Sequence, residues 1–470
     1  MTGPLWTSAE ITKATGGQSV DADFDVFGLS IDTRSIEQGD LFIALAGVRD
    51  GHEFVEQALG KGAAGSLASR AVAGSTLLVP DVLVGLEQMG VAARNRASSA
   101  LRGAITGSVG KTSLTQAVSK GLAMAGRSHA SIKSYNNHIG VPLTLARMPR
   151  DTERAVFEIG MNHAEEIDPL SRMVRPHAVC VSTVGPVHIE NFPDGEAGVA
   201  RAKAEIFAGL EPGGTAILNA DDRWFDLLAA EAKALGAKIV RFGAGAECEA
   251  RLTYIKAVPG GAQVSAVIHG KAVTFPILQS GAHWGHNSLA ALMMMQALGV
   301  DLEIGIAALG AFEPLDGRGA EREVRLADGG TFTLIDESYN ANPLSMVAVL
   351  RSLGGREAMG RKIVALTDML ELGEAGPRLH AEIAGAIAAA GIDQVFCSGP
   401  LMKSLWDALP ATQRGGYAMT AAELALGVTS AVEAGDVVMV KGSNGSKASV
   451  IAEALASLDR GDGANAIFAV

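Results

Sequence analysis

Cysteine is scarce in this chain, and the few cysteines lie far apart. Cys180, Cys248 and Cys397 are the only ones in 470 residues, an odd number without the close spacing of a zinc site. The sequence therefore excludes a disulfide framework and a cysteine-based metal centre, as is typical of proteins from a reducing compartment. We accordingly expect a cytoplasmic protein.

Long apolar runs and an excess of positive charge are also missing. The sequence has no apolar stretch of about 18 or more residues that could cross a bilayer, and its first residues lack the pattern of a signal peptide. The formal net charge of −12 argues against an extended nucleic-acid surface. We expect neither a membrane span nor a nucleic-acid partner, so any phosphate site must be local.

Glycine, in contrast, is abundant. The chain has 57 glycines, only 5% aromatic residues and 48% hydrophobic residues, a profile typical of α/β folds with many turns. Because 470 residues are too many for one ordinary core, several domains are expected. We predict three: a small mixed α/β domain at 1–83, a central, mostly parallel sheet at 84–314, and a second, smaller doubly wound (Rossmann-like) α/β domain at 315–470.

Apolar runs followed by polar or glycine-rich loops predict the strands of the two larger domains. These runs lie at 155–159, 178–184, 215–218, 332–335, 363–366, 395–397 and 437–440. Ligands of open α/β sheets bind beyond the carboxyl ends of the strands. The residues that follow these runs are therefore the candidates for a functional site.

A glycine loop lies between a predicted strand at 102–106 and a predicted helix at 114–124. It consists of Gly107, Ser108, Val109, Gly110, Lys111, Thr112 and Ser113. In such a loop backbone N–H groups bind phosphate, the lysine adds positive charge and the threonine hydroxyl can coordinate Mg²⁺. The full phosphate-loop pattern has glycine where this chain has Ile105, so the match covers its second half. We interpret the loop as an ATP site; the alternative is a chance Gly-Lys-Thr turn.

Three further residues could serve the same site. Glu158 lies near the end of one predicted strand and His188 follows the next, so both should project from the sheet edge that carries the loop. Mg²⁺ prefers oxygen ligands, which makes Glu158 a natural ligand. His188 alone would be an unusual one, and a histidine in this position is more often a hydrogen-bonding loop residue. Lys203 lies on a predicted helix, where the residue pattern alone favours a solvated lysine.

Taken together, several segments resemble the Mur ligases of bacterial peptidoglycan synthesis. The segments are the phosphate loop at 106–113 and the runs at 134–145, 158–162, 201–206, 336–343, 368–373 and 440–443. The runs at 30–34, 39–42 and 50–52 are similar to the UDP-binding first domain of the family. The resemblance therefore extends over nearly the whole chain and implies a UDP-substrate domain, a P-loop ATPase-type domain and a ligase domain, in that order.

The resemblance implies an ATP- and Mg²⁺-dependent ligase that activates a carboxylate as an acyl phosphate and joins it to an amine. Three of its segments are most similar to family members that act on UDP-N-acetylmuramoyl-tripeptide and D-alanyl-D-alanine, so we expect these two substrates. We also expect a monomer. Two alternatives stay open: a sister Mur or folylpolyglutamate-type ligase, and a P-loop nucleotide switch without ligase chemistry.

Roles for individual residues also follow from the resemblance. Lys203 matches a lysine that the family carbamylates with CO₂, which turns a cation into an anionic oxygen ligand. Together with Thr112, Glu158 and His188, the carbamylated lysine would form the metal site. The resemblance thus implies Lys111, Lys203 and His188 as catalytic residues.

The resemblance extends to the residues that bind ATP and the other substrates. Asn287 matches the adenine contact, Arg318 a phosphate contact and Asp336 the ribose contact. The residues expected to bind the other substrates are Ser30, Asp32, Thr33, Arg34, Asn136, Asn137, Tyr339, Asn340 and Asn342. The chain departs from the family pattern at Trp284, where asparagine is usual, and at Asn444, where arginine is usual.

Overall fold

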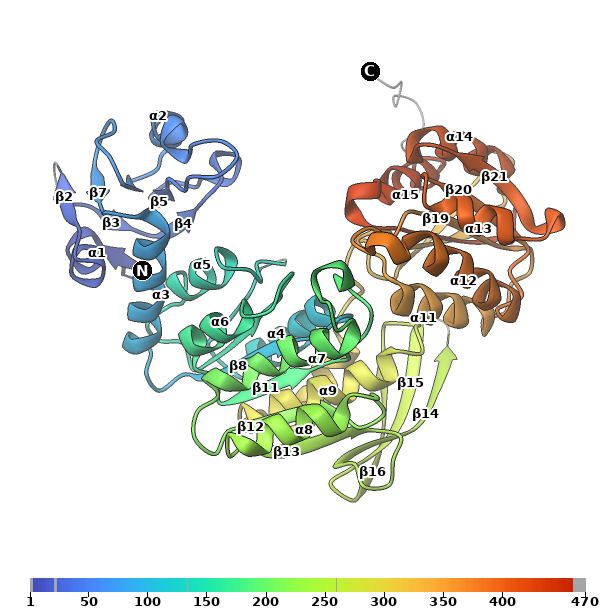
Figure 1. Ribbon diagram of the computed structural model, residues 1–470, viewed down its shortest axis with the longest axis horizontal. Coiled ribbons are helices and arrows are strands. Elements are labelled where there is room, and N and C mark those ends of the chain that lie inside the picture. Colours follow the sequence, from blue (N-terminus) through green and yellow to red (C-terminus); the bar gives the residue numbers. More distant parts are fainter. Residues whose placement is uncertain (1–2, 21–22, 133, 259, 460–470) are drawn as a thin grey trace.

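The computed structural model describes residues 3–20, 23–132, 134–258 and 260–459. Within these residues the strands form sheets of two, five, nine and six strands. Figure 1 shows three units: a small one in blue at the N-terminal end, a central one from cyan to yellow, and a third in orange and red. The predicted fold class, mixed α/β in three units, is confirmed.

The first unit is built on a five-stranded sheet in the order β2-β7-β6-β5-β4. The elements of this unit are β1 (Trp6–Thr7), α1 (Ser8–Thr15), β2 (Gln18–Val20), β3 (Asp25–Val26), β4 (Gly28–Ser30), β5 (Asp40–Ile43), α2 (Val55–Gly60), β6 (Gly65–Ala68) and β7 (Thr76–Leu78). Helix α1 begins with a capping box between Thr7 and Glu10 and ends at Gly16, whose φ is 65°. Local sequence thus sets both ends of this helix.

The central unit contains a nine-stranded sheet in the order β16-β15-β14-β13-β12-β11-β8-β10-β9. Its strands are β8 (Leu101–Thr106), β9 (Ser128–Ala130), β10 (Arg154–Glu158), β11 (Ala178–Val181), β12 (Thr215–Asn219), β13 (Lys238–Gly243), β14 (Ala250–Val258), β15 (Gly261–Ile268) and β16 (Lys271–Ile277). Neighbouring strands from β8 to β13 pair in parallel. Strands β14, β15 and β16 form an antiparallel meander at one edge.

Helices cover both faces of the central sheet. They are α3 (Val82–Arg96), α4 (Lys111–Ala125), α5 (Gly140–Ala146), α6 (Ile167–Val174), α7 (Glu196–Ala204), α8 (Phe225–Ala234), α9 (Trp284–Ala297) and α10 (Leu302–Gly310). Successive strand residues belong to different hydrophobic clusters, Val156 to one and Phe157 to the other. Burial on both faces explains why these strands read as continuous apolar runs in the sequence.

The third unit repeats the scheme with a six-stranded sheet in the order β17-β18-β22-β19-β20-β21. Its elements are β17 (Ala320–Arg325), β18 (Thr331–Glu337), α11 (Pro343–Gly354), β19 (Lys362–Thr367), α12 (Gly376–Ala389), β20 (Gln394–Ser398), α13 (Met402–Ala408), β21 (Arg414–Ala418), α14 (Ala421–Ala431), β22 (Val437–Lys441) and α15 (Ala448–Ala456). All pairs are parallel except β17 with β18. No helix within the described ranges is long and apolar enough to cross a membrane.

The core of the first unit continues into the central unit. Ala146 at the end of α5 belongs to the same hydrophobic cluster as Trp6 and Leu29. Trp6 Nε1 donates a hydrogen bond to the Ala146 carbonyl at 2.8 Å, and Arg147 Nε donates to the Leu29 carbonyl at 2.9 Å. Helix α3 contributes Met89 to this cluster, and the predicted limit at 83/84 falls within this helix. The limits of the three domains stay predictions.

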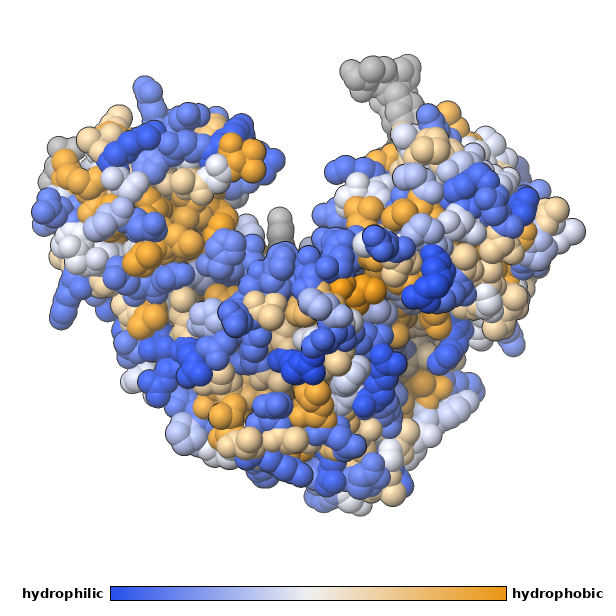
Figure 2. Space-filling model, in the orientation of Figure 1, coloured by the Kyte–Doolittle hydropathy of each residue, from blue (hydrophilic) through white to orange (hydrophobic). Residues whose placement is uncertain are grey.

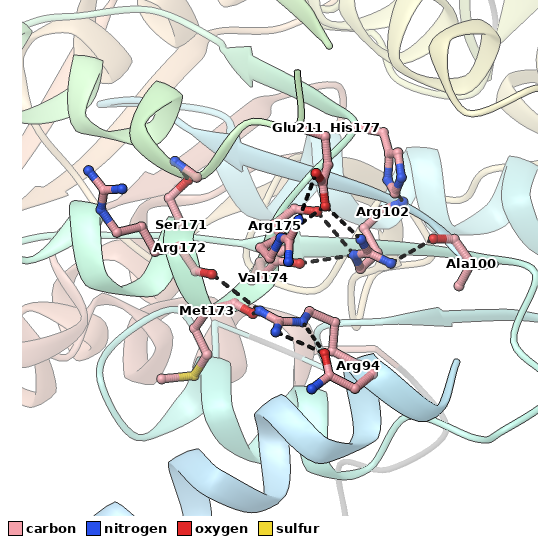
Figure 3. A network of polar contacts seen from close by, with 12 residues as sticks. Arg94, Ala100, Arg102, Ser171, Arg172, Met173, Val174, Arg175, His177 and Glu211 are labelled. Atoms are coloured by element: carbon pink, nitrogen blue, oxygen red, sulfur yellow. Dashed lines mark hydrogen bonds and ion pairs between the residues drawn. The ribbon is translucent and has the colours of Figure 1, made fainter. Parts of the chain in front are cut away.

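Helix α6 is held at its C-terminus by two buried arginines (Figure 3). Arg94 Nη1 donates to the Met173 carbonyl at 2.7 Å, and Arg102 Nε donates to the Val174 carbonyl at 3.0 Å. The last carbonyls of a helix have no partner within the helix, and positive charge is favourable beside them. Although burial lowers the pKa of Arg102 to about 10, it stays charged at neutral pH. The arginines therefore tie α6 to α3 and β8.

Candidate active site

A cleft of about 500 Å³ is lined by loops of the central and third units. The lining loops follow β8, β10 and β11 in the central sheet and β18, β19 and β22 in the third. These are carboxyl ends of parallel strands, where open α/β sheets bind their ligands. Figure 2 shows the surface hollowed between the first and third units, with hydrophilic residues of the central unit along the floor of the hollow.

The phosphate loop owes its shape to two glycines and to the residues after β11. Gly107 and Gly110 have φ angles of 149° and 85°, which favour glycine. A Cβ atom on Gly107 would lie 1.9 Å from Ser182 Oγ. Ser182 Oγ donates to the Val109 carbonyl at 2.6 Å. The strand predicted at 178–184 is therefore too long and ends at Val181, because the following residues turn to support the loop.

Lys111 begins helix α4 and lies at the mouth of the loop. Its Nζ donates to the Gly107 carbonyl at 2.5 Å. The first N–H groups of α4 have no partner within the helix, and the helix dipole adds positive potential at this end. Burial lowers the pKa of Lys111, and Glu158 opposes this effect. Loop, helix and lysine together are suited to bind phosphate.

A chain of polar contacts joins the loop hydroxyl to the third unit. Thr112 Oγ1 lies 3.2 Å from Ser134 Oγ, which lies 2.8 Å from the Tyr339 hydroxyl. The Arg318 guanidinium carbon lies 3.8 Å above the centre of the Tyr339 ring. Ser134 was not predicted as a site residue, although it belongs to the segment 134–145. The available signal was its hydroxyl side chain in the same segment as the predicted residues Asn136 and Asn137.

Glu158 carries an unpaired buried oxygen. The residue is 1% exposed, and Asn136 Nδ2 donates to its Oε1 at 2.6 Å, whereas Oε2 has no partner. A buried carboxylate oxygen without a partner is costly unless a cation binds it. The described residues contain no cluster of three His, Cys, Asp or Glu side chains suited to a metal. Glu158 and the Thr112 hydroxyl thus fit Mg²⁺, which binds few protein oxygens and retains waters.

Lys203 is buried, so the expectation of a solvated lysine is wrong. It lies on α7 and is 1% exposed. Its Nζ lies 3.7 Å from Met161 Sδ, a weak acceptor. Burial, reinforced by Lys111, lowers the pKa of Lys203 well below its ordinary value. Burial therefore favours the neutral, nucleophilic form of this amine.

His188 meets a carboxylate of the third unit that was not predicted. His188 Nδ1 lies 2.8 Å from Glu371 Oε2, and both residues have left-handed φ angles, of 52° and 62°. Burial, together with the nearby positive charges of Lys111 and Lys203, lowers the pKa of His188 to about 4. Glu371 belongs to the segment 368–373, but local sequence patterns do not show that it meets a histidine of another unit.

The predicted nucleotide residues divide between the cleft and its surroundings. Asn287 lies beside the loop, because a Cβ atom on Gly110 would be 3.4 Å from its Oδ1. Asp336 does not line the cleft; its Oδ1 accepts a hydrogen bond from the Ser338 N–H at 3.0 Å. Trp284 is buried, with its ring centre 5.8 Å from that of Phe312. The aromatic side chain therefore replaces the usual asparagine within a packed core.

The structure brings most of the predicted site residues together. Those that line the cleft are Ser108, Val109, Gly110, Lys111, Thr112, Ser113, Asn136, Asn137, Glu158, His188, Asn287, Arg318, Tyr339, Asn340 and Asn342. Those outside its lining are Ser30, Asp32, Thr33, Arg34, Gly107, Lys203 and Asp336. The first four lie on the first unit, where the Arg34 guanidinium holds the pKa of Asp32 at about 2.

Fold and cleft define a class of protein: a nucleotide-binding enzyme whose phosphate loop faces a second α/β unit across a polar cleft. The sequence matches the models of the Mur ligase middle domain at residues 105–295 and of the Mur ligase, glutamate ligase domain at 322–444. Together with the relatives below, these matches show that the chain belongs to the Mur ligase family, whose members are ATP-dependent ligases.

Two curated relatives and one solved structure each match most of the chain. UDP-N-acetylmuramoyl-tripeptide–D-alanyl-D-alanine ligase of Rickettsia prowazekii (strain Madrid E) is 31% identical, over 94% of this chain and 98% of the relative. The ligase of the same name from Bacillus subtilis (strain 168) is 34% identical over 84% of each chain. A crystal structure of MurF from Acinetobacter baumannii has a TM-score of 0.83 at 26% identity, over 96% of this chain and 99% of that chain.

Proposed function

We propose that the chain uses ATP to join D-alanyl-D-alanine to UDP-N-acetylmuramoyl-tripeptide through an acyl phosphate. The names of the curated relatives support these substrates. The observation that carries the proposal is the cleft in which the phosphate loop faces Arg318 and Tyr339 of the third unit. A cleft shared by two units suits a reaction in which three substrates must meet.

The proposed reaction has two steps. A carboxylate oxygen of the tripeptide attacks the γ-phosphorus of ATP, the bond to the β–γ bridging oxygen breaks, and ADP leaves. The amine of D-alanyl-D-alanine then attacks the acyl carbon, phosphate leaves with its C–O bond electrons, and the new amide loses a proton. Lys111 and Arg318 offset the repulsion between carboxylate and γ-phosphate and stabilise the charge that develops in transfer.

The metal site of this proposal consists of Thr112, Glu158, His188 and a carbamate on Lys203. Mg²⁺ bound there would neutralise charge on the phosphates. The neutral Nζ of Lys203 would attack the carbon of CO₂ and form an N–C bond. Loss of a proton from the nitrogen would then leave an anionic carbamate. The carbamate is supported by the burial of Lys203 beside Lys111, because a second buried ammonium would repel both Lys111 and Mg²⁺.

The remaining predicted residues would bind the UDP group, the peptide and D-alanyl-D-alanine. Ser30, Asp32, Thr33 and Arg34 would bind the UDP group on the first unit. Asn136, Asn137, Tyr339, Asn340 and Asn342 would bind the peptide and D-alanyl-D-alanine at the cleft, which all five line. Asp336 keeps its proposed role at the ribose. The expected monomer stays a prediction.

A coupled assay tests the proposal. ADP release is measured with UDP-N-acetylmuramoyl-tripeptide and one amine at a time, and the product is weighed by mass spectrometry. We expect D-alanyl-D-alanine to stimulate ADP release and a product heavier by the dipeptide less water. Equal stimulation by D-glutamate or L-lysine would assign the chain to a sister ligase, and hydrolysis independent of all acceptors would favour a nucleotide switch.

A further inference from the structure

Glu205 binds the start of helix α6 from another part of the chain. It directly follows α7 and opens the short 3₁₀ helix η4 (Glu205–Gly209). One carboxylate oxygen accepts from the Glu165 N–H at 2.7 Å, and the other accepts from the N–H groups of Ile167 at 3.1 Å and Asp168 at 3.2 Å. Three donors at a helix N-terminus, which lack partners within the helix, thus converge on one side chain.

The two segments are also packed along their length. Ser171 Oγ donates to the Ile206 carbonyl at 2.5 Å, and the Gly209 N–H donates to Ser171 Oγ at 3.2 Å. A Cβ atom on Gly209 would lie 2.0 Å from the Ser171 carbonyl oxygen. Helix α6 and η4 therefore lie in close contact, with Glu205 at the end of the contact that is nearer to the cleft.

Both segments lead to residues of the proposed metal site. Residues 159–166 connect Glu158 to α6, and Met161 and Asn162 in this connection line the cleft. Lys203 lies two positions before Glu205, and its Nζ contacts Met161 Sδ. Glu205 therefore joins the segment that begins at Glu158 to the segment that carries Lys203.

We propose that Glu205 is a positioning residue that fixes Lys203 relative to Glu158 by tying η4 to the N-terminus of α6. This inference rests on the proposed function, in which Lys203 and Glu158 serve one metal ion. Side chains that hold metal ligands in place are often as important as the ligands themselves. A carboxylate is required because three N–H donors meet two acceptor oxygens, whereas an amide has one oxygen and would present N–H₂ to a donor.

The other end of α6 provides a matched control. Arg94 stabilises the same helix at its C-terminus through the Met173 carbonyl, far along the chain from Lys203 and outside the cleft lining. Arg94→Met removes that interaction and keeps most of the side chain's apolar bulk. If Glu205 had a purely structural role, Glu205→Ala and Arg94→Met would have the same activity when compared at equal stability.

The experiment compares the full-length protein with Glu205→Ala, Glu205→Gln and Arg94→Met in kcat, KM for ATP and thermal unfolding, with and without added bicarbonate. We expect Glu205→Ala to lower kcat by about 10- to 100-fold, as loss of other outer-shell partners does. KM for ATP should change little, and bicarbonate should restore part of the rate. Glu205→Gln should fall between, and Arg94→Met should lose stability but keep its kcat.

Carbon-13 NMR with labelled bicarbonate provides a second measurement that needs no ligation. We expect a carbamate signal in the unmodified protein and in Arg94→Met, and a weaker one in Glu205→Ala. The positioning role would be overturned if Glu205→Ala kept the kcat of the unmodified protein. It would also be overturned if Glu205→Ala and Arg94→Met lost kcat equally. Absence of the signal from the unmodified protein would instead contradict the carbamate, and the positioning role would then be decided by kcat alone.

Discussion

The positive charge of Lys111 favours phosphate binding but disfavours folding. The lysine side chain is half-buried at the loop, where burial lowers its pKa and only Glu158 opposes this effect. A buried charge without an anion destabilises the fold, whereas the same charge stabilises a bound phosphate. Substitution should therefore separate the two effects.

We predict that Lys111→Met abolishes most ligation without unfolding the protein. Loss of one charged group that stabilises a transition state costs roughly 10²- to 10³-fold in kcat. The melting temperature should be unchanged or slightly higher, because the buried charge is gone. ADP release and thermal unfolding check both parts. Near-normal turnover would refute the role of the phosphate loop.

A second prediction concerns the pH dependence of stability at Lys203. Its folded-state pKa is lowered, so the unfolded chain binds more protons and the penalty for burying the lysine is greatest at low pH. In buffers free of CO₂, Lys203→Met should therefore raise the melting temperature, and the gain should shrink as the pH rises toward about 10, the value for an unfolded lysine. Ligation should be lost. A gain independent of pH would argue against the buried, neutral amine.

Sequence alone predicted some of these residues and missed others for a physical reason. Thr112 could be found from the Gly-Lys-Thr loop after β8, and Glu158 because it ends the apolar run of β10. The burial of Lys203 could not, since it depends on the packing of α7 against the segment containing Met161. Glu371 was missed because its contact with His188 joins separate units.

At the scale of elements, the buried strands of the two larger sheets were the most predictable features. The runs predicted at 363–366 and 437–440 are the interiors of β19 and β22, each extended by one residue or two. Strands buried on both faces have a continuous apolar pattern. The antiparallel meander β14 to β16 was not predicted, because several of its residues face solvent and the apolar run is interrupted.

We predict that Arg102→Met destabilises the protein by about 3 kcal/mol. The substitution leaves the buried Val174 and Ala100 carbonyls without their charged donor and removes one of the two arginines that pair with Glu211. Arg102 Nε donates to Val174, its Nη1 to Ala100, and its Nη2 pairs with Glu211 at 3.4 Å. The measurement is chemical denaturation.

Arg172→Met is the matched control for this prediction, because Arg172 forms an exposed ion pair with Asp168 on the same helix. Such pairs contribute about 0.3–0.5 kcal/mol. Equal losses in the two variants would show that the buried position of Arg102 is unimportant.

At the scale of the whole molecule, the central unit contacts its two neighbours differently. The first unit shares a hydrophobic core with α5. The third unit contacts the loop after β11 through individual side chains: a Cβ atom on Gly185 would lie 1.9 Å from Leu344 Cδ1, and His188 lies beside Glu371. Ile189 packs against the cores of both units.

We predict that Gly185→Ala lowers kcat, because the added methyl group overlaps the Leu344 side chain and disturbs the contact between the loop after β11 and the start of α11. Leu344→Ala in the same chain should restore much of the rate by removing the overlap. The double-mutant cycle should give a coupling energy of about 0.5–3 kcal/mol, as for residues in contact. Additive effects of the two substitutions would show that the contact does not govern activity.

The shared core of the first unit also limits how this chain can be recombined with its relatives. A chimera joined at residue 83 or 84 would pair the β-sheet of one protein with α3 and α5 of another, and would mismatch the packing around Trp6 and Ala146. A crossover after Met148 would transfer that core intact. Such a crossover would also separate β8 and the phosphate loop from β10 and β11, their neighbours in the central sheet, so no single crossover exchanges the first unit without mismatching one of the two cores.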